Sequence, residues 1–393
     1  MKVADRAHVP PFAVMEIIAA ANERRAAGQH VLNLAAGEPG PGASRAVRDR
    51  AIDLLGAGGG LGYTEALGVP ALRAAISAHY RDWYDIPLDP GRVAVTTGSS
   101  GGFTLAFLAA FDAGDRVALA RPGYPAYRNI LAALGCQVVE LACGPQTRFQ
   151  PTVEMLAATH EQQPLDGLVI ASPANPTGTM LDVAEIAGIA HWCAAHGVRL
   201  VSDEIYHGIS YTGVQAASAA RFLDSGAIVV NSFSKYWAMT GWRLGWLILP
   251  ADLVGPVDAL AGNFALCPPT LAQHAGIAAL TAEGMAAARQ GALGYSAARE
   301  LLLERLPELG WTRVAPADGA FYLYADVSAS GMDSTTWCAR LLDEAGVALT
   351  PGTDFDQVDG HRYVRLSFAS GVDVVREAVD RIVTWQDALT RQG

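Results

Sequence analysis

Residues 232–243 read SFSKYWAMTGWR, and they contain Lys235, one of only two lysines among the 28 basic residues of the chain. The other is Lys2, near the N-terminus. Arginine cannot be deprotonated in a protein, whereas a desolvated lysine can lose its proton and become a nucleophilic amine. Such an amine forms Schiff bases with carbonyl compounds. A genome rich in arginine codons explains the composition equally well, so the surrounding sequence has to decide what Lys235 does.

The composition is that of a large folded protein. At 393 residues the chain exceeds the size at which single cores stop growing, which predicts two domains. Its net charge of −11, without a block of basic residues, argues against nucleic acid or an anionic membrane as a partner. The five cysteines form no Cys-x-x-Cys pair and indicate free thiols in a reducing compartment. With no signal-peptide pattern at the N-terminus, we expect a cytoplasmic protein.

Short β-branched segments alternate with helical segments from about residue 93 to residue 249. This alternation predicts an α/β fold with a mostly parallel seven-stranded sheet and helices on both faces. In such sheets, ligands bind beyond the carboxyl ends of the strands. We expect the strands at 93–97, 116–120, 137–141, 167–171, 199–202, 227–232 and 244–249, with helices at 102–111, 127–134 and 183–196.

The C-terminal part of the sequence predicts a smaller α+β domain. A further helix is expected at 14–25, and its pattern fits packing on either domain. We divide the chain into an N-terminal arm that joins the small domain (1–45), a large domain (46–285) and the small domain (286–393). In the small domain we expect strands at 321–327, 347–349 and 361–369 and helices at 334–345 and 372–389.

Polar residues follow the predicted strands of the large domain. Residues 98–102 read GSSGG before a helix, which places backbone N–H groups and hydroxyls at the positive end of a helix dipole, as in a phosphate site. Helix capping explains this segment equally well. Two prolines surround Asn175 in SPANPTG (172–178), where an ordinary Asn-Pro turn is the alternative.

An acid and a basic segment follow the next two strands. Asp203 ends a buried strand, where a carboxylate is costly unless it meets a cation or hydrogen bonds, although a helix cap is the alternative. Ser232 and Arg243 flank Lys235, and Arg243 can bind a phosphate with two donors. Together these groups supply an amine, an acid for a ring nitrogen and donors for a phosphate, which a phosphorylated pyridine aldehyde requires.

The combination Asn-Pro-Thr-Gly, Asp-x-x-Tyr and Ser-x-x-Lys-(x)7-Arg resembles the class I pyridoxal-phosphate-dependent aminotransferases of the aspartate aminotransferase fold family, nearly from end to end. The resemblance implies the fold called PLP fold type I, with pyridoxal 5'-phosphate as cofactor. It makes Lys235, Asp203 and Tyr206 catalytic: Lys235 forms the Schiff base and moves the proton, and Asp203 keeps the pyridine nitrogen protonated. It assigns cofactor binding to Ser99, Ser100, Tyr124, Asn175, Asp203, Tyr206, Ser232, Ser234, Lys235 and Arg243, and to Tyr63.

The resemblance also places the substrate carboxylate and a second subunit. Alternation in 363–368 puts Arg365 on the face opposite its apolar neighbours, which a solvent-facing arginine would also show. By the resemblance, Arg365 binds the α-carboxylate, assisted by the backbone of Gly37 and by Asn175. Tyr124 corresponds to the ring that stacks on the cofactor. Tyr63 matches a tyrosine that reaches a neighbouring subunit's phosphate, which implies a homodimer with shared active sites.

Two departures from the family bear on the substrate. Many relatives that bind a second carboxylate carry a lysine near the position of Ser100, and this chain has none there; Asp356 stands where the family often has glycine. We therefore expect an aminotransferase that moves an amino group between a small or neutral L-amino acid, such as alanine or valine, and 2-oxoglutarate or pyruvate. The alternatives are an aspartate aminotransferase, a β-lyase or other enzyme of the same fold, and a non-catalytic binding module. We expect no metal site, because His191, Cys193 and His196 do not share a helical face.

Overall fold

The computed structural model describes residues 1–40 and 42–392. Its centre is a seven-stranded sheet in the order β2-β8-β7-β6-β5-β3-β4, in which only β8 runs antiparallel to its neighbours. This sheet confirms the predicted architecture, and each predicted strand overlaps an observed one. The strands are β2 (Val93–Thr96), β3 (Arg116–Arg121), β4 (Gln137–Ala142), β5 (Gly167–Ala171), β6 (Arg199–Asp203), β7 (Ile228–Ser232) and β8 (Gly245–Ile248).

Two apolar cores lie on opposite faces of this sheet, because alternate side chains of a strand point to opposite faces. Along β5, Leu168 and Ile170 belong to one core and Val169 to the other. The core that contains Val169 includes the phenylalanines of α4 (Gly98–Ala110), and the opposite core includes residues of α3 and α7. The helices of this part are α2 (Arg45–Gly56), α3 (Pro70–Tyr84), α4, α5 (Pro125–Leu134), α6 (Val153–Gln162), α7 (Val183–Ala195), α8 (Ala251–Ala265) and α9 (Thr270–Ala279).

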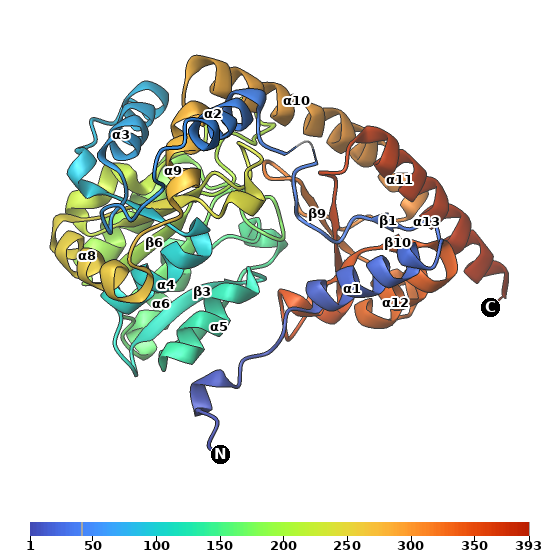
Figure 1. Cartoon of the computed structure of the whole chain (residues 1–393). Helices are drawn as coiled ribbons and strands as arrows, with labels where there is room; N and C mark the ends of the chain where they lie inside the picture. The colour runs from blue at the N-terminus through green and yellow to red at the C-terminus, as the bar shows by residue number, and fades with distance from the viewer. Residues whose placement is uncertain (41, 393) are drawn as a thin grey trace.

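A second lobe is built on a three-stranded antiparallel sheet, in the order β11-β12-β9 (Figure 1). The helix α10 (Ala282–Glu304) leads into it from the large lobe, and α13 packs along α10 (Figure 1). Arg365 in β12 stands opposite Tyr324 in β9. The remaining elements are β9 (Tyr322–Asp326), β10 (Val347–Ala348), β11 (Thr350–Pro351), β12 (Tyr363–Ser367), α11 (Leu306–Leu309), α12 (Ser334–Ala345) and α13 (Val372–Gln392).

The N-terminal arm lies on this second lobe. The strand β1 (Leu32–Asn33) pairs in parallel with β10, and α1 (Ala13–Ala26) contacts β10 and β11. Ala21 of α1 shares a small apolar core with Leu342 and Ala348. The backbone N–H of Ala13 donates to Asp354 at 3.1 Å. Figure 1 shows α1 beside α12, while the residues before α1 extend toward the large lobe.

Two predicted elements differ from the observed ones. The strand expected at 347–349 is observed only as β10, which pairs with the arm strand β1, and a separate strand β11 follows it and pairs with β12. The helix expected at 102–111 begins at Gly98, so the glycines and serines of GSSGG form its first turn rather than a preceding loop. In the described ranges 1–40 and 42–392, no helix is both long and apolar enough to cross a membrane.

Candidate active site

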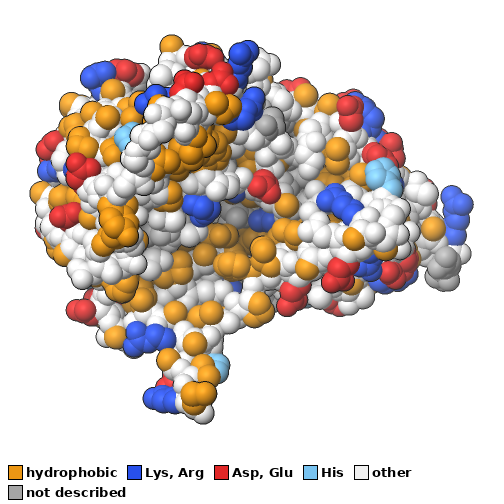
Figure 2. Space-filling model, viewed as in Figure 1, with side chains coloured by type: hydrophobic (Ala, Val, Ile, Leu, Met, Phe, Trp, Pro, Cys, Tyr) orange, Lys and Arg blue, Asp and Glu red, His pale blue; other side chains and the backbone are white. Residues whose placement is uncertain are grey.

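A cavity of about 350 Å³ lies between the two lobes, beyond the carboxyl ends of β5 and β6. Figure 2 shows a hollow between the lobes with charged side chains at its floor. The cavity brings together residues from the arm, from the large sheet and from β9 and β12. They are Val14, Met15, Ile18, Ala36, Gly37, Glu38, Ser99, Ser100, Phe103, Tyr124, Ala126, Tyr127, Ile130, Asn175, Asp203, Ile205, Tyr206, Ser234, Lys235, Thr240, Arg243, Tyr322 and Arg365.

Lys235 lies in the loop after β7, with its ammonium group in this cavity. Its Nζ donates a hydrogen bond to the carbonyl oxygen of Gly37 at 2.6 Å and lies 5.8 Å from the ring centroid of Tyr206. Burial, assisted by the positive charge of Arg365, lowers the pKa of Lys235 to about 8. A free amine is therefore accessible near neutral pH, as nucleophilic and proton-transfer chemistry requires.

Asp203 is the last residue of β6 and is buried. Its Oδ1 accepts from the backbone N–H of Ile205 at 3.0 Å, and its Oδ2 accepts from the hydroxyl of Tyr127. Burial raises the pKa of Asp203 to about 6, although these hydrogen bonds and the charge of Lys235 act in the opposite direction. A cationic ring nitrogen next to Asp203 would stabilise the carboxylate, so this environment fits a protonated pyridine.

Arg365 is buried among uncharged partners at another wall of the cavity. Its Nη1 donates to Asn175 Oδ1 at 2.9 Å, and its Nη2 donates to the carbonyl of Ala35 at 2.7 Å. The guanidinium carbon lies 4.5 Å from the ring centroid of Tyr322. Among the described residues, the Nε of Arg365 has no hydrogen-bond partner. A buried guanidinium that lines a cavity and has no carboxylate among its hydrogen-bond partners suits a carboxylate ligand.

Tyr206 lies beside these groups. Its hydroxyl is 2.8 Å from that of Tyr322, and either oxygen can be the donor. Burial raises the pKa of Tyr206 well above its usual value, so this residue is a neutral hydrogen-bonding group at physiological pH. The cavity therefore contains Tyr206 and Asn175 as neutral donors between the acid and the buried guanidinium.

The start of α4 and Arg243 form a second polar corner of the cavity. Gly98 has a φ of +67°, and a Cβ at this position would lie 2.5 Å from Nη2 of Arg243. The guanidinium therefore lies directly against the first turn of α4, where backbone N–H groups have no intrahelical partner. Ser99, Ser100 and Ser234 line the same cavity. This combination of helix start, hydroxyls and arginine fits a phosphate.

Two predicted residues, Ser232 and Tyr63, lie outside the cavity lining, whereas Tyr124 belongs to it. The Ser232 hydroxyl bonds to Ser234 Oγ at 2.8 Å and to the Leu244 carbonyl at 3.1 Å, so it braces the lysine loop from outside the cavity lining. Tyr124 lines the cavity and stacks on Phe12 with ring centroids 6.1 Å apart. Tyr63 lies outside the lining and is 84% exposed. Asp356, the departure noted above, is buried and lies 3.7 Å from Arg121.

Several residues of the cavity were not predicted from the sequence. Tyr127 lies in the first turn of α5, three residues after Tyr124, which precedes this helix. That spacing is the one feature of the sequence that could have placed Tyr127 on the same side as Tyr124. Tyr322 belongs to β9, where the alternation of Tyr322 and Tyr324 indicates one common face. The apolar residues of α1 and the carboxylate of Glu38 reach the cavity only because the arm folds back onto the second lobe.

Comparison with known proteins gives matches over nearly the whole chain. The sequence model of the family "Aminotransferase class I and II" matches residues 29–382. The valine–pyruvate aminotransferase of Mycobacterium tuberculosis is 54% identical over 384 residues, which are 98% of both chains. The aspartate/prephenate aminotransferase of Thermus thermophilus is 34% identical, over 94% of this chain and 95% of that protein.

Solved structures match in the same way. A crystal structure of an aminotransferase from Mycobacterium tuberculosis superposes with a TM-score of 0.96 at 53% identity, covering 99% of this chain and 100% of the other. The aspartate aminotransferase of Thermus thermophilus with maleate gives a TM-score of 0.91 at 31% identity, covering 98% and 99%. Both lobes and their relative placement are thus shared with solved aminotransferases.

Proposed function

The chain belongs to the aminotransferase class I and II family, and we propose that it transfers the amino group between a small or neutral L-amino acid, of the valine or alanine type, and pyruvate or 2-oxoglutarate. The observation that carries the substrate proposal is the lining of the cavity. Of the described residues in that lining, three are cationic: Lys235, Arg243 and Arg365. Each has a role in the proposed chemistry, so none remains for a second carboxylate.

The rest of the lining supports an uncharged side chain. The arm helix α1 contributes Val14, Met15 and Ile18, and α5 contributes Ile130. The acids in the lining, Asp203 and Glu38, repel rather than attract a second carboxylate. The similarity to a protein named valine–pyruvate aminotransferase, at 54% identity, points to the same class of donor and acceptor.

We propose pyridoxal 5'-phosphate as the cofactor, because the cavity contains a group suited to each part of that molecule. When bound, it supplies an aldehyde that takes up amino groups and a ring that withdraws electrons. Arg243, Ser99, Ser100 and Ser234 would hold the phosphate at the start of α4, with Ser232 bracing the loop. Tyr124 would face the ring.

The catalytic roles follow from the environments of the residues. Lys235, whose pKa is lowered to about 8, would form the covalent link to the cofactor's aldehyde, and its free amine would move a proton between the substrate's Cα and the cofactor. Asp203 would keep a proton on the ring nitrogen by its charge. Asn175 and Tyr206 would donate hydrogen bonds to the ring oxygen. Arg365 binds and orients the α-carboxylate, with Asn175 and the backbone of Gly37 beside it.

We further propose that the protein is a homodimer with shared active sites. Large apolar side chains are exposed on α2 (Ile52, Leu55) and at the end of α8 (Phe264, Leu266). Exposed Tyr63 follows Gly62, which is bonded to Thr270 of α9, and α9 packs against α2. Figure 2 shows apolar surface in the region where Figure 1 places α2 and α9. Contiguous exposed apolar surface is typical of a subunit interface.

The five free cysteines, four of them buried, support a reducing compartment such as the cytoplasm.

Steady-state kinetics with purified protein test the substrate proposal. Valine with pyruvate and alanine with 2-oxoglutarate should each yield the new amino acid, with kcat/KM at least equal to that of aspartate with 2-oxoglutarate. A preference for aspartate above about a hundredfold, or nearly 3 kcal/mol, would contradict the proposal, because it requires a further cation. Release of ammonia without a new amino acid would instead indicate a β-lyase.

A further inference from the structure

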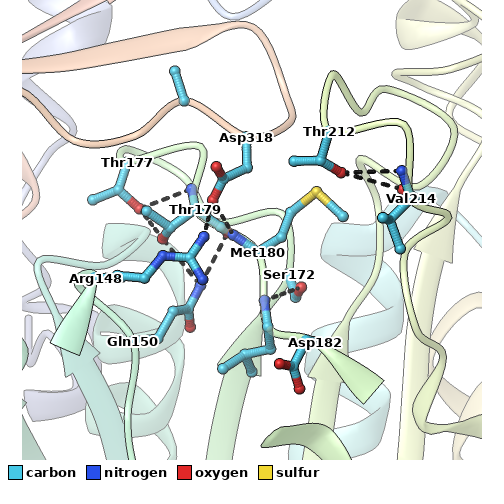
Figure 3. A network of polar contacts seen from close by, with 12 residues as sticks. Arg148, Gln150, Ser172, Thr177, Thr179, Met180, Asp182, Thr212, Val214 and Asp318 are labelled. Atoms are coloured by element: carbon cyan, nitrogen blue, oxygen red, sulfur yellow. Dashed lines mark hydrogen bonds and ion pairs between the residues drawn. The ribbon is translucent and has the colours of Figure 1, made fainter. Parts of the chain in front are cut away.

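The segment 317–320, directly before β9, is held between two loops of the large lobe (Figure 3). One is the loop 172–180, which carries Asn175, and the other is the loop 206–211, which begins with Tyr206. Gly319 N donates to the Gly178 carbonyl at 2.8 Å, and Ala320 N donates to the Ile209 carbonyl at 3.0 Å. A Cβ on Gly178 would lie 2.7 Å from the Gly319 carbonyl oxygen, so the two backbones are in direct contact.

Asp318 provides the charged part of this contact. Its Oδ2 accepts a hydrogen bond from the backbone N–H of Met180 at 3.2 Å and forms an ion pair with Arg148. In Figure 3 the carboxylate points from its segment toward both donors. The Asp318 side chain is 13% exposed, whereas that of Arg148 is 48% exposed. Met180 is buried and its N–H belongs to the backbone of the loop, so this bond ties Asp318 directly to the loop, whereas Arg148 is the more exposed partner.

The backbone of this segment also depends on its surroundings. Ala317 and Ala320 have φ values of +50° and +56°. Alanine rarely adopts this left-handed conformation unless neighbouring groups hold it. Both alanines are fully buried, and the Ala317 carbonyl accepts from Arg299 Nε at 2.7 Å. The contacts with the two loops therefore determine where β9 begins.

The position of β9 in turn determines the carboxylate subsite. Arg365 in β12 pairs with Tyr324 in β9, and Arg365 Nη1 donates directly to Asn175 Oδ1 at 2.9 Å. Asn175 lies in the loop that Asp318 contacts, three residues before Gly178. The attachment of the segment before β9 to the Asn175 loop therefore links these two residues through the backbone, in addition to their direct hydrogen bond. The residues that make these contacts lie outside the cavity lining; they are Gly178, Met180, Ile209, Asp318, Gly319 and Ala320.

We propose that Asp318 is a positioning residue, which keeps Asn175 and Arg365 at the spacing that fits the substrate's α-carboxylate. The inference rests on the proposed function, because it concerns the carboxylate subsite of that reaction. Asp318 lies outside the lining of the cavity in which substrate and cofactor would bind. Its loss should therefore weaken binding of every amino acid and 2-oxo acid alike and leave the cofactor's contacts in place.

The test compares Asp318→Ala and Asp318→Asn in the cofactor-loaded enzyme. Asp318→Ala should raise KM for valine, alanine and pyruvate by about tenfold, lower kcat by less than about threefold, and leave the visible absorption of the cofactor unchanged. Asp318→Asn retains an acceptor for Met180 N–H and should recover most of the lost affinity. Arg148→Met removes only the more exposed ion pair and should change KM by less than about twofold.

Asp182→Ala is the matched control. Asp182 lies two residues after the loop 172–180, and it does not contact the segment 317–320 (Figure 3). Asp182 caps α7 by accepting from Glu185 N at 2.8 Å, so its loss should lower the melting temperature and leave KM unchanged. Unchanged KM in Asp318→Ala, or an equal rise in Asp182→Ala, would overturn the positioning role. If Asp318→Ala does not fold, Asp318→Ser takes its place, because its hydroxyl is too short to reach Met180 N–H: a KM about tenfold higher than that of Asp318→Asn supports the proposal, and a wild-type KM overturns it. A wild-type enzyme without transamination would instead refute the proposed function.

Discussion

Lys235 is the residue on which the proposed chemistry depends most directly. Its depressed pKa and its position in the cavity allow a role that a permanently charged guanidinium cannot take. Lys235→Ala and Lys235→Arg should both lower turnover by about 10²–10⁴-fold, the range for loss of a proton-transfer group. In the wild type, borohydride should fix the cofactor irreversibly to the protein, and peptide mapping should locate it on Lys235. Near-normal turnover in either variant would refute the assignment.

Asp203 allows a prediction about pH, because folding changes its pKa. The unfolded chain loses the proton near 3.8 and the folded chain near 6, so the free energy of unfolding falls as the pH rises through this window. The difference of about two units corresponds to about 3 kcal/mol. Asp203→Asn, stripped of cofactor, should therefore be more stable than the wild type at pH 8 and nearly equal to it at pH 4.

The measurement is urea unfolding of both proteins across this pH range. With the cofactor bound, a ring cation offsets the buried charge, so the advantage of Asp203→Asn should shrink, while its turnover falls at least about a hundredfold. Equal stability of the two cofactor-free proteins at pH 8 would show that the carboxylate carries no desolvation cost. A structural cap would behave in that way.

The residues of the site differ in how far the sequence reveals them. Local sequence is enough to single out Lys235, Asp203 and Arg243, because each stands in a short motif. Burying their charged groups without a partner would also cost free energy, which points to a ligand. Tyr127 and Tyr322 carry no such signal, because a tyrosine in an apolar helix or strand is equally typical of a core. Their hydroxyls matter only through Asp203 and Tyr206, which lie far away in sequence.

At the scale of elements, continuous apolar segments made the central strands predictable. The predicted 167–171 segment is β5 without change, since a strand buried on both faces reads as one apolar run. Two-residue strands such as β10 and β11 give no periodicity of their own. Their separation depends on pairing with β1 and β12, which local sequence does not encode.

The first turn of α4 provides a prediction at this scale. Gly98→Ala places an L-residue at a φ of +67° and its Cβ 2.5 Å from the Arg243 guanidinium. We expect cofactor affinity to fall by about 10–100-fold, because the left-handed conformation costs about 1–2 kcal/mol and Arg243 has to move. Turnover at saturating cofactor should change little, since Lys235 and Asp203 are untouched. Titration of cofactor-free protein by fluorescence measures the affinity.

Gly101→Ala is the matched control on the same helix. A Cβ at Gly101 would lie 3.5 Å from that of Thr97, an ordinary contact, and alanine favours helix. This variant should bind the cofactor as the wild type does. If both variants lost affinity equally, the effect would belong to helix α4 as a whole and not to the corner formed by Gly98 and Arg243.

At the scale of the whole molecule, the substrate site lies between two lobes that the arm connects. The large lobe supplies Lys235 and Asp203, the second lobe supplies Arg365, and α1 closes one side with apolar residues. The predicted boundaries of 1–45, 46–285 and 286–393 remain a proposal. The contacts of α1 with β10 and β11 favour an arm that belongs to the second lobe.

Tyr63 extends this reasoning to a second copy of the chain. Its neighbours are fixed, because Thr270 Oγ1 donates to the Gly62 carbonyl at 2.7 Å and Gln273 Nε2 donates to Thr64 Oγ1 at 3.0 Å. A tyrosine on an anchored segment, 84% exposed and next to apolar surface, is well placed to reach a neighbouring subunit. If it contacts the phosphate there, Tyr63→Ala should weaken cofactor binding by about tenfold or more, as loss of a hydrogen bond to a charged group does.

Subunit mixing decides whether Tyr63 acts within its own chain or across the dimer. Lys235→Ala and Tyr63→Ala proteins, unfolded and refolded together at limiting cofactor, should regain about a quarter of wild-type activity, because half of the dimers are hybrids with one intact site. Mixing Lys235→Ala with Asp203→Ala should give no recovery, since both residues line the cavity of one chain. Absence of recovery in the first mixture, with hybrids verified by mass, would place Tyr63 outside the partner's site. The proposal of shared active sites would then be wrong, while the roles of Lys235 and Asp203 would stand.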